Sequence, residues 1–173
     1  DHDAKPHIDI AVIRLPQISN FDDFDPLAAE EGVRVRFVRD LTQLGTPDLL
    51  IIPGTKSTIA DLAALRDTGL DRAIVALARG GTPTIGICGG FQMLGTSVAD
   101  PLGVEGAPGV SAGLGLLDMH TELSGEKRLA QVSGHCAFDD ASVSGDEIHS
   151  GVSSGASRAR PAFHLAGRAA RKA

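Results

Sequence analysis

GICGGFQMLG, residues 86–95, places a cysteine between a short β-like run and a helical pattern. The run Thr84–Ile87 (TIGI) has the β-branched and small residues of a buried strand, and the helical pattern begins at about Phe91. Glycines close to Cys88 permit a sharp strand-to-helix turn, because they let backbones approach closely and tolerate strained dihedral angles. This arrangement is typical of a nucleophile elbow, which holds a reactive side chain above the edge of a sheet.

The same stretch favours a reactive sulfur. The helix that follows directs its free N–H groups and positive dipole end at Cys88, and both favour the thiolate, which is the attacking species. Cys88 also falls at the carboxyl end of its strand, where open parallel sheets bind their ligands. The alternative is a buried structural cysteine behind a glycine-rich turn, but the flanking sequence favours the catalytic interpretation.

The rest of the first half alternates strand and helix patterns. Strand patterns cover Ile8–Leu15, Val33–Val38 and Leu49–Ile52, and helical patterns cover Ser57–Asp67 and Asp71–Arg79. Strands that alternate with helices pair in parallel, with helices on both faces of the sheet. From Asp100 onward, glycine, serine and short β-like pieces predominate, at 113–119, 129–132 and 147–149. We therefore expect an α/β fold: an open, mainly parallel, flavodoxin-like sheet with flanking helices and a β-rich, irregular second half.

Composition limits the classes of function. The 173 residues are 42% hydrophobic, which fits one folded domain, and the lack of Trp and Tyr argues against an aromatic platform for single-stranded nucleic acid. Residues 1–157 hold all 22 acidic residues against 11 basic ones, which argues against binding of phosphate backbones. Residues 158–173 carry five basic residues and no acidic one. We expect one domain over residues 1–163 and a basic, disordered tail over residues 164–173.

Cysteine usage and hydropathy indicate the compartment. Cys88 and Cys136 stand in unlike contexts, without the paired spacing of a metal site or a disulfide framework. No apolar stretch approaches the roughly 18 residues of a membrane span, and no charged-then-apolar leader opens the sequence. We expect a cytoplasmic protein that binds no metal, no membrane and no nucleic acid.

A second candidate site is Pro53–Thr58, which reads PGTKST. Its glycine, lysine, serine and threonine suggest a phosphate-binding loop, but Thr55 separates Gly54 from Lys56 and the first glycine of that motif is missing. The better interpretation is a strand-to-helix turn whose backbone N–H groups lie beside the strand end of Cys88 and stabilise an oxyanion. An ordinary capped turn is the alternative.

These stretches resemble a known family. Gly86–Gly95, Pro53–Thr58 and above all Ile10–Leu27 (IAVIRLPQISNFDDFDPL) are similar to the C-terminal class I glutamine amidotransferase domains of cobyric acid synthases. Asp146–Gly151 (DEIHSG) is similar to another segment of that family. The resemblance covers about residues 8–163, and the Arg-Leu-Pro stretch is its most specific part.

The resemblance implies a reaction in which Cys88 attacks the side-chain amide of glutamine and releases ammonia, leaving a glutamyl thioester for water to hydrolyse. It further implies that Gly54 and Gly89 supply the N–H groups of the oxyanion hole. In the family, the ammonia passes to an upstream synthetase domain that amidates corrinoid carboxylates with ATP and Mg²⁺, in cobalamin biosynthesis. Nothing in this sequence resembles that domain, so we expect no cofactor in this chain.

One part of the family pattern is missing. Thiolate chemistry needs a general base, normally a histidine, and the family's catalytic histidine lies in a Gly-Thr-Tyr-Leu-His-Gly-like segment that this sequence does not contain. We therefore expect that this chain lacks that segment and that its catalytic pair is incomplete. His149 is the best substitute, because Glu147 lies two residues away on the same strand face, but a structural or substrate-side role fits it better.

Other polar residues are expected to be structural. The remaining histidines show no spacing typical of metal ligands, and Asp22, Asp23 and Asp25 are expected to cap a helix or face solvent. Two further functions stay open. One is a non-catalytic amidotransferase-like module that binds glutamine or a partner, and the other is a cysteine hydrolase or stress protein on the same scaffold, against which the Arg-Leu-Pro stretch argues.

Overall fold

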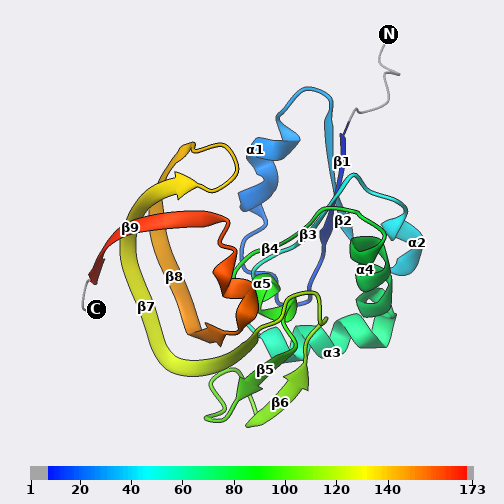
Figure 1. Cartoon of the computed structure of the whole chain (residues 1–173). Coiled ribbons are helices and arrows are strands. Elements are labelled where there is room, and N and C mark those ends of the chain that lie inside the picture. Colours follow the sequence, from blue (N-terminus) through cyan, green and yellow to red (C-terminus); the bar gives the residue numbers. More distant parts are fainter. Residues whose placement is uncertain (1–7, 171–173) are drawn as a thin grey trace.

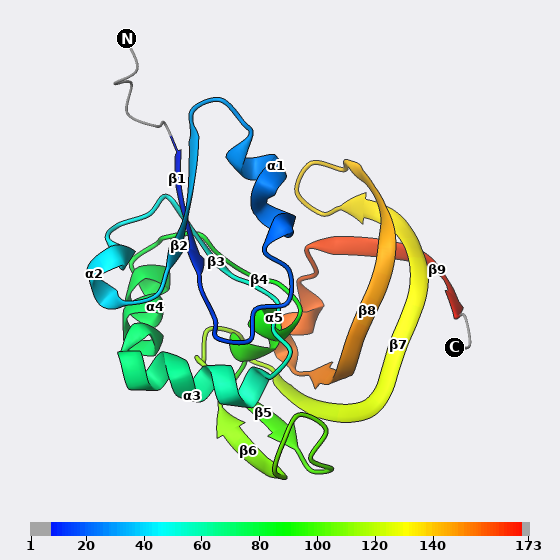
Figure 2. The ribbon, with the colours of Figure 1, turned by 180° about the vertical axis from the view of Figure 1, so that it is seen from behind.

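The computed structural model describes residues 8–170, except for the side chains of residues 126–128 and 167–170. Two sheets make up the fold, one in each half of the chain (Figure 1). Helices surround the first sheet, and a long curved hairpin dominates the second half, as the view from behind also shows (Figure 2). The α/β class and the mainly parallel first sheet agree with the sequence-based prediction.

The first sheet has the strand order β2-β1-β3-β4, and every pairing in it is parallel. Strands β1 and β3 occupy the interior and are built from apolar runs, so their side chains are buried on both faces, for example Val12, Ile13 and Ile52. The strands are β1 (Ile8–Ile13), β2 (Val33–Val38), β3 (Leu49–Ile52) and β4 (Thr84–Gly86). Strand β4, which leads into Cys88, lies at the edge of the sheet.

The helices cover both faces of this sheet. On one face, Leu62, Leu65 and Ile74 belong to the same buried cluster as the sheet residue Ile52. On the other face, Phe24 packs in a cluster with Val12. The helices are η1 (Asp22–Phe24), α1 (Asp25–Ala28), α2 (Leu41–Leu44), α3 (Thr58–Thr68), α4 (Leu70–Arg79) and α5 (Gly89–Met93). No helix among residues 8–170 is long and apolar enough to cross a membrane.

The second half forms a mixed sheet of order β6-β5-β7-β8, with β9 paired to β7. Its members are β5 (Ser97–Asp100), β6 (Gly109–Ala112), β7 (His120–Cys136), β8 (Ser142–Ser154), the short helix η2 (Ala156–Ala159) and β9 (Phe163–Ala170). Val98 and Leu123 share a buried cluster with residues of the first sheet, so one core joins the two halves. The predicted pieces at 129–132 and 147–149 lie inside β7 and β8, whereas 113–119 forms turns rather than a strand.

The end of the described chain differs from the expected loose tail. Residues 163–170 form strand β9, which pairs antiparallel with β7, for example Leu165 with Gly134. A strand edge supplies the hydrogen-bonding partners that an Ala- and Arg-rich segment can use whatever its side chains, so composition alone did not indicate this pairing. The last part of the predicted tail, residues 171–173, lies outside the described residues.

Candidate active site

Cys88 lies on a strained turn between β4 and α5. Its φ of 50° and ψ of −112° are unusual for a residue with a side chain, and the residue is exposed. The neighbouring glycines make the turn possible: a Cβ on Gly90 would overlap the carbonyl oxygen of Ile52, and one on Gly86 would lie 2.6 Å from the carbonyl oxygen of Gly90. The predicted elbow is therefore present in the geometry of Cys88.

The β3–α3 turn, residues Pro53–Ser57, lies against this elbow. A Cβ built on Gly54 would lie 3.6 Å from the Cβ of Cys88, and one built on Gly89 would lie 2.6 Å from the Cγ2 atom of Thr55. The two predicted oxyanion-hole glycines are thus brought together around Cys88, one from each turn. Their role as N–H donors to an oxyanion stays a prediction.

A polar cleft of about 510 Å³ opens on one side of Cys88. It is bordered by the β3–α3 turn, the start of α3 and the loop after β5, and its polar side chains include Asn20, Lys56, Gln92 and Glu105. The backbone N–H of Thr58 donates to Glu105 Oε2 at 2.5 Å, and the Thr58 hydroxyl lies 3.2 Å from Glu105 Oε1. The carboxylate of Glu105 is partly buried and therefore poorly solvated, and this raises its pKa.

Glu105 was not predicted from the sequence. It follows a glycine- and proline-rich segment, and its position depends on Asp100, whose oxygens accept hydrogen bonds from the N–H groups of Val104 at 2.7 Å and Glu105 at 2.8 Å. These bonds close the loop after β5 and direct Glu105 toward α3. The sequence around Glu105 showed only a change to glycine, serine and short β-like pieces from Asp100 onward, which does not indicate where the loop leads.

Gln92 connects the cleft to the hairpin. It lies on α5, four residues after Cys88, and is 7% exposed. Its amide Nε2 donates to the carbonyl oxygen of Ser150 at 3.0 Å, and its Oε1 lies 3.3 Å from the Thr58 hydroxyl. Gln92 therefore connects strand β8 to the start of α3, one helical turn after Cys88.

An apolar cleft of about 600 Å³ opens on the other side of Cys88. It lies between the edge strand β4 and the hairpin strand β8, and its exposed apolar side chains come from both halves of the molecule: Ile85, Ile87, Phe91, Ile148, Val152 and Phe163. Cys88 and His149 border both clefts, so the structure brings the predicted nucleophile and the predicted substitute base to one site.

His149 is held by two oxygens. Its Nδ1 lies 3.1 Å from the carbonyl oxygen of Gly151, and its Nε2 lies 3.0 Å from Oε1 of Glu147, as the predicted His–Glu pair requires. Each ring nitrogen thus faces an oxygen acceptor, and neither directs a free lone pair at the sulfur of Cys88. This arrangement favours a structural or substrate-side role for His149 over that of a general base.

The other histidines of the described chain lie elsewhere. His135 stacks on His164, with ring centroids 5.0 Å apart, near Asp140 at the end of the hairpin, and His120 Nε2 lies 3.0 Å from Ser154 Oγ. His2 and His7 lie outside the described residues. Within residues 8–170, no group of three or more His, Cys, Asp or Glu residues is placed to hold a metal ion.

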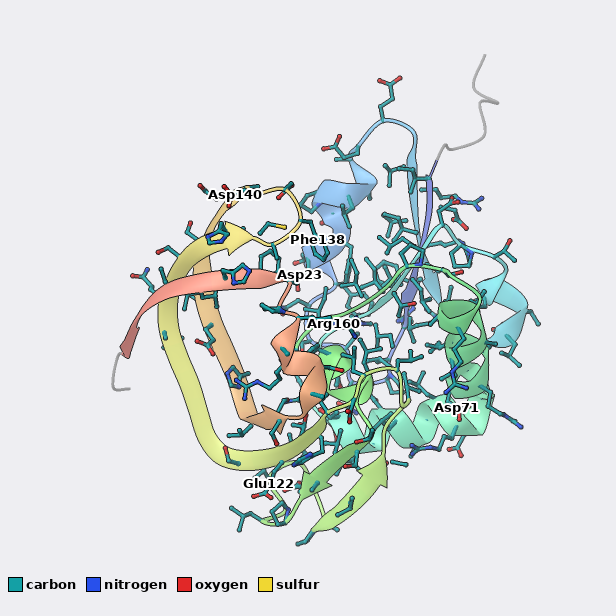
Figure 3. The ribbon with its side chains drawn as sticks, in the orientation of Figure 1. Asp23, Asp71, Glu122, Phe138, Asp140 and Arg160 are labelled. Carbon is teal, nitrogen blue, oxygen red and sulfur yellow. The ribbon has the colours of Figure 1, made fainter. Side chains whose placement is uncertain are left out.

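The aspartates near Asn20 face solvent rather than a helix end. Asp22, Asp23 and Asp25 are exposed, and neither η1 nor α1 has a side-chain cap (Figure 3 labels Asp23). Both alternatives in the sequence-based expectation were structural, and solvent exposure is the one observed.

A cysteine on a strained elbow at the carboxyl edge of a parallel sheet, faced by a glycine turn and two clefts, defines an α/β domain with a candidate cysteine nucleophile. The family model for the CobB/CobQ-like glutamine amidotransferase domain matches residues 9–172. The chain belongs to this family.

Relatives and solved structures agree with this membership. The chain is 50% identical over 153 residues to a cobyric acid synthase of Bradyrhizobium sp. (strain BTAi1 / ATCC BAA-1182), covering 88% of the chain and 31% of the relative. It is 49% identical over 166 residues to a cobyric acid synthase of Dehalococcoides mccartyi (strain CBDB1), covering 91% of the chain and 33% of the relative. The chain therefore spans about a third of the length of these relatives.

The fold is shared with more distant solved structures. A glutamine amidotransferase crystal structure superposes with a TM-score of 0.58 at 18% identity, covering 82% of this chain and 70% of that one. The structure of PurLQS from Thermotoga maritima superposes with a TM-score of 0.60 at 20% identity, covering 86% of this chain and 68% of that one. These likenesses concern the fold, which is that of a class I glutamine amidotransferase domain.

Proposed function

We propose that this chain is the glutaminase part of a cobyric acid synthase, in which Cys88 takes the amide nitrogen from glutamine. The observation that carries the proposal is the strained turn at Cys88, which exposes the sulfur between two glycines that face it. Elbows of this kind hold a nucleophile where backbone N–H groups can stabilise a tetrahedral oxyanion. Family membership supplies the substrate class.

We place glutamine in the polar cleft. Its α-ammonium group is matched by the carboxylate of Glu105, and its α-carboxylate is matched by Lys56, since both side chains border the cleft together with Cys88. A side-chain amide that extends from these two groups would reach Cys88 and Gly89, which border the same cleft. The apolar cleft is also bordered by two opposite charges, Glu147 and Arg158, but Oε1 of Glu147 already lies 3.0 Å from Nε2 of His149.

The reaction follows from this placement. The Cys88 thiolate adds to the amide carbon, and the N–H groups of Gly54 and Gly89 stabilise the oxyanion that forms. The carbon–nitrogen bond then breaks, ammonia leaves with a proton delivered to it, and a glutamyl thioester remains. Water hydrolyses the thioester to glutamate and restores the thiolate. Both proton transfers need a base that His149, as it is held, does not provide.

The released ammonia would serve a synthetase domain of the complete enzyme. That domain would activate corrinoid carboxylates with ATP and Mg²⁺ and form the amides of a cobalamin precursor, and this chain would bind neither cofactor. The relatives are about three times as long as this chain, and their names support the proposal. We expect such a biosynthetic enzyme to work in the cytoplasm.

A second function has its own support. Because both nitrogens of His149 are engaged by oxygens, the described residues include no histidine directed at Cys88. A domain of this kind could bind glutamine, or a partner, without turnover. Binding and catalysis differ in what happens after the thiolate meets the substrate, so they can be separated experimentally.

The test uses the purified chain and its Cys88→Ala variant. The chain is incubated with a glutamine-derived diazoketone, and mass spectrometry locates any added mass; ammonia release from glutamine is then measured. Labelling at Cys88 together with ammonia release supports a glutaminase, and both should vanish in Cys88→Ala. Labelling without turnover supports the same site with an incomplete catalytic pair. An unlabelled chain that still binds glutamine by calorimetry would favour the binding module.

A further inference from the structure

Asp61 is a buried carboxylate near the start of α3 that the proposed reaction does not use. It is 1% exposed. Its oxygens accept hydrogen bonds from the hydroxyl of Thr55 at 2.5 Å and from the backbone N–H of Gln17 at 3.2 and 3.3 Å. Burial raises the pKa of Asp61, so keeping the carboxylate there costs free energy. A costly group of this kind is better explained by what it positions than by net stability.

The bonds of Asp61 join two loops. The loop after β1 and the β3–α3 turn run side by side, with a bridge between Ile18 and Thr55. The backbone N–H of Ser19 donates to the carbonyl oxygen of Gly54 at 3.0 Å. Two residues after Gly54, the backbone N–H of Lys56 donates to the carbonyl oxygen of Gln17 at 3.0 Å. The carboxylate of Asp61 lies behind this pairing and binds one group from each loop.

The β3–α3 turn contains Gly54 and packs against Gly89, so it contacts the elbow at both candidate donors. The methyl group of Thr55 occupies the space next to Gly89 into which a Cβ would project, at 2.6 Å, and Gly54 faces the side chain of Cys88. A shift of this turn therefore moves Gly54, one of the two candidate oxyanion donors, relative to Cys88 and disturbs the packing of Thr55 against Gly89, the other donor. Misplacement of a reacting group by about 1 Å costs on the order of a hundredfold in rate.

We infer that Asp61 is a positioning residue, which holds the β3–α3 turn against the elbow through Thr55 and Gln17 and so sets the distance between Gly54 and Cys88. The inference rests on the proposed function, because it concerns the oxyanion-stabilising step of that reaction. Asp61 touches no substrate, and its effect passes through the turn alone.

The experiment compares two reactions at the same sulfur. A γ-activated ester of glutamate acylates Cys88 through a tetrahedral oxyanion, whereas iodoacetamide alkylates it by direct displacement, without one. In Asp61→Asn, an amide group that donates replaces one of the two accepting oxygens and the negative charge is lost, so the side chain holds Thr55 and Gln17 less strongly. Acylation at saturating ester should slow about tenfold or more, while alkylation stays within about twofold of the wild-type rate.

Two further variants sharpen the comparison. Thr55→Val keeps the branched side chain beside Gly89 but removes the hydroxyl, and it should slow acylation in the same selective way. Asp67→Asn, an exposed aspartate on the same helix, is the matched control and should leave both rates unchanged. Equal slowing of acylation and alkylation in Asp61→Asn, or no slowing of either, would overturn the inference.

Amide hydrogen exchange provides a readout that needs no reaction. Asp61→Asn should speed exchange at Lys56 and Ser19, whose N–H groups bridge the two loops, more than exchange in the second turn of α3. If the wild-type chain is not acylated at all, the proposed function fails, and exchange alone then decides whether Asp61 holds the turn. If Asp61→Asn leaves the exchange rates of the Lys56 and Ser19 amides unchanged, Asp61 does not hold the turn.

Discussion

Gly54 and Cys88, 34 positions apart in the sequence, lie next to each other on two separate turns. A Cβ built on Gly54 would lie 3.6 Å from the Cβ of Cys88, which is ordinary van der Waals contact. On the other side of the elbow, a Cβ on Gly90 would overlap the carbonyl oxygen of Ile52. The glycines around Cys88 thus have different roles: Gly90 allows the turn to form, and Gly54 leaves space next to the side chain of Cys88.

This difference predicts that two alanine substitutions affect different properties: Gly90→Ala the stability of the fold, and Gly54→Ala the acylation of Cys88. Gly90→Ala should destabilise the fold by about 2–3 kcal/mol or more, because the backbone of β3 cannot move aside without disturbing the sheet. Gly54→Ala should change the free energy of unfolding by less than about 1 kcal/mol, yet slow acylation of Cys88, since its methyl group narrows the approach to the sulfur. Urea denaturation and the labelling assay measure the two effects. Equal destabilisation by both variants would contradict the assignment.

His149→Gln tests whether this histidine acts as the base. General base catalysis contributes roughly 10²- to 10⁴-fold to a rate, so loss of a true base would lower ammonia release by at least that much. Because Gly151 and Glu147 occupy both nitrogens of His149, we expect less than about a threefold change in the acylation of Cys88 by the activated ester. His120→Gln is the control, because His120 lies opposite Ser154 at one end of the β7–β8 pairing. A hundredfold loss confined to His149→Gln would establish it as the base.

Glu105→Gln tests the placement of the substrate. The amide can still accept from Thr58 but no longer attracts a cation, so affinity for the glutamine-derived diazoketone should fall roughly tenfold or more. The labelling rate at saturating reagent should change little, since Glu105 lies away from the reacting carbon in the proposed pose. Glu122→Gln, an exposed glutamate on β7, is the matched control (Figure 3). A lower saturating rate with unchanged affinity would place Glu105 in another role.

Local sequence was sufficient where sterics alone determine the structure. Strand β3 has the predicted bounds Leu49–Ile52, since a short apolar run that ends in Pro-Gly has few other conformations. The elbow at Cys88 was predicted for the same reason, because its glycines are needed by backbone contacts that a sequence motif can reveal. The helix after it, however, runs from Gly89 to Met93 and so begins two residues before the predicted start at about Phe91.

The parts that were missed depend on distant partners. Strands β7 and β8 are rich in glycine, serine and charged residues, and they become continuous strands only because they pair with each other. Likewise, β9 forms where β7 offers an edge. Glu105 reaches the polar cleft through the bonds of Asp100, and the burial of Asp61 depends on the loop after β1. No window of sequence around these residues contains the partner that decides their role.

The buried carboxylate of Asp61 and the partly buried carboxylate of Glu105 also predict how stability depends on pH. Burial raises the pKa of Asp61 and Glu105 above their ordinary values of 3.8 and 4.5. The folded protein therefore holds a proton on each group at pH values at which the unfolded chain has already released it. The stability that these protons contribute is fully present below the ordinary values and is lost as the pH rises through the raised ones.

Asp100 acts in the opposite direction at lower pH. The N–H groups of Glu105 and Val104 lower its pKa, so its contribution is present above the ordinary value of 3.8 and is lost as the pH falls below it. From about pH 5 to about pH 7, we therefore expect Asp61 and Glu105 to make the urea midpoint fall as pH rises. Asp61→Asn and Glu105→Gln should each flatten this slope, and Asp67→Asn should not. A slope that is unchanged in both variants would mean that these carboxyl groups titrate alike in the folded and unfolded chain. The folded structure would then not raise the pKa of either group.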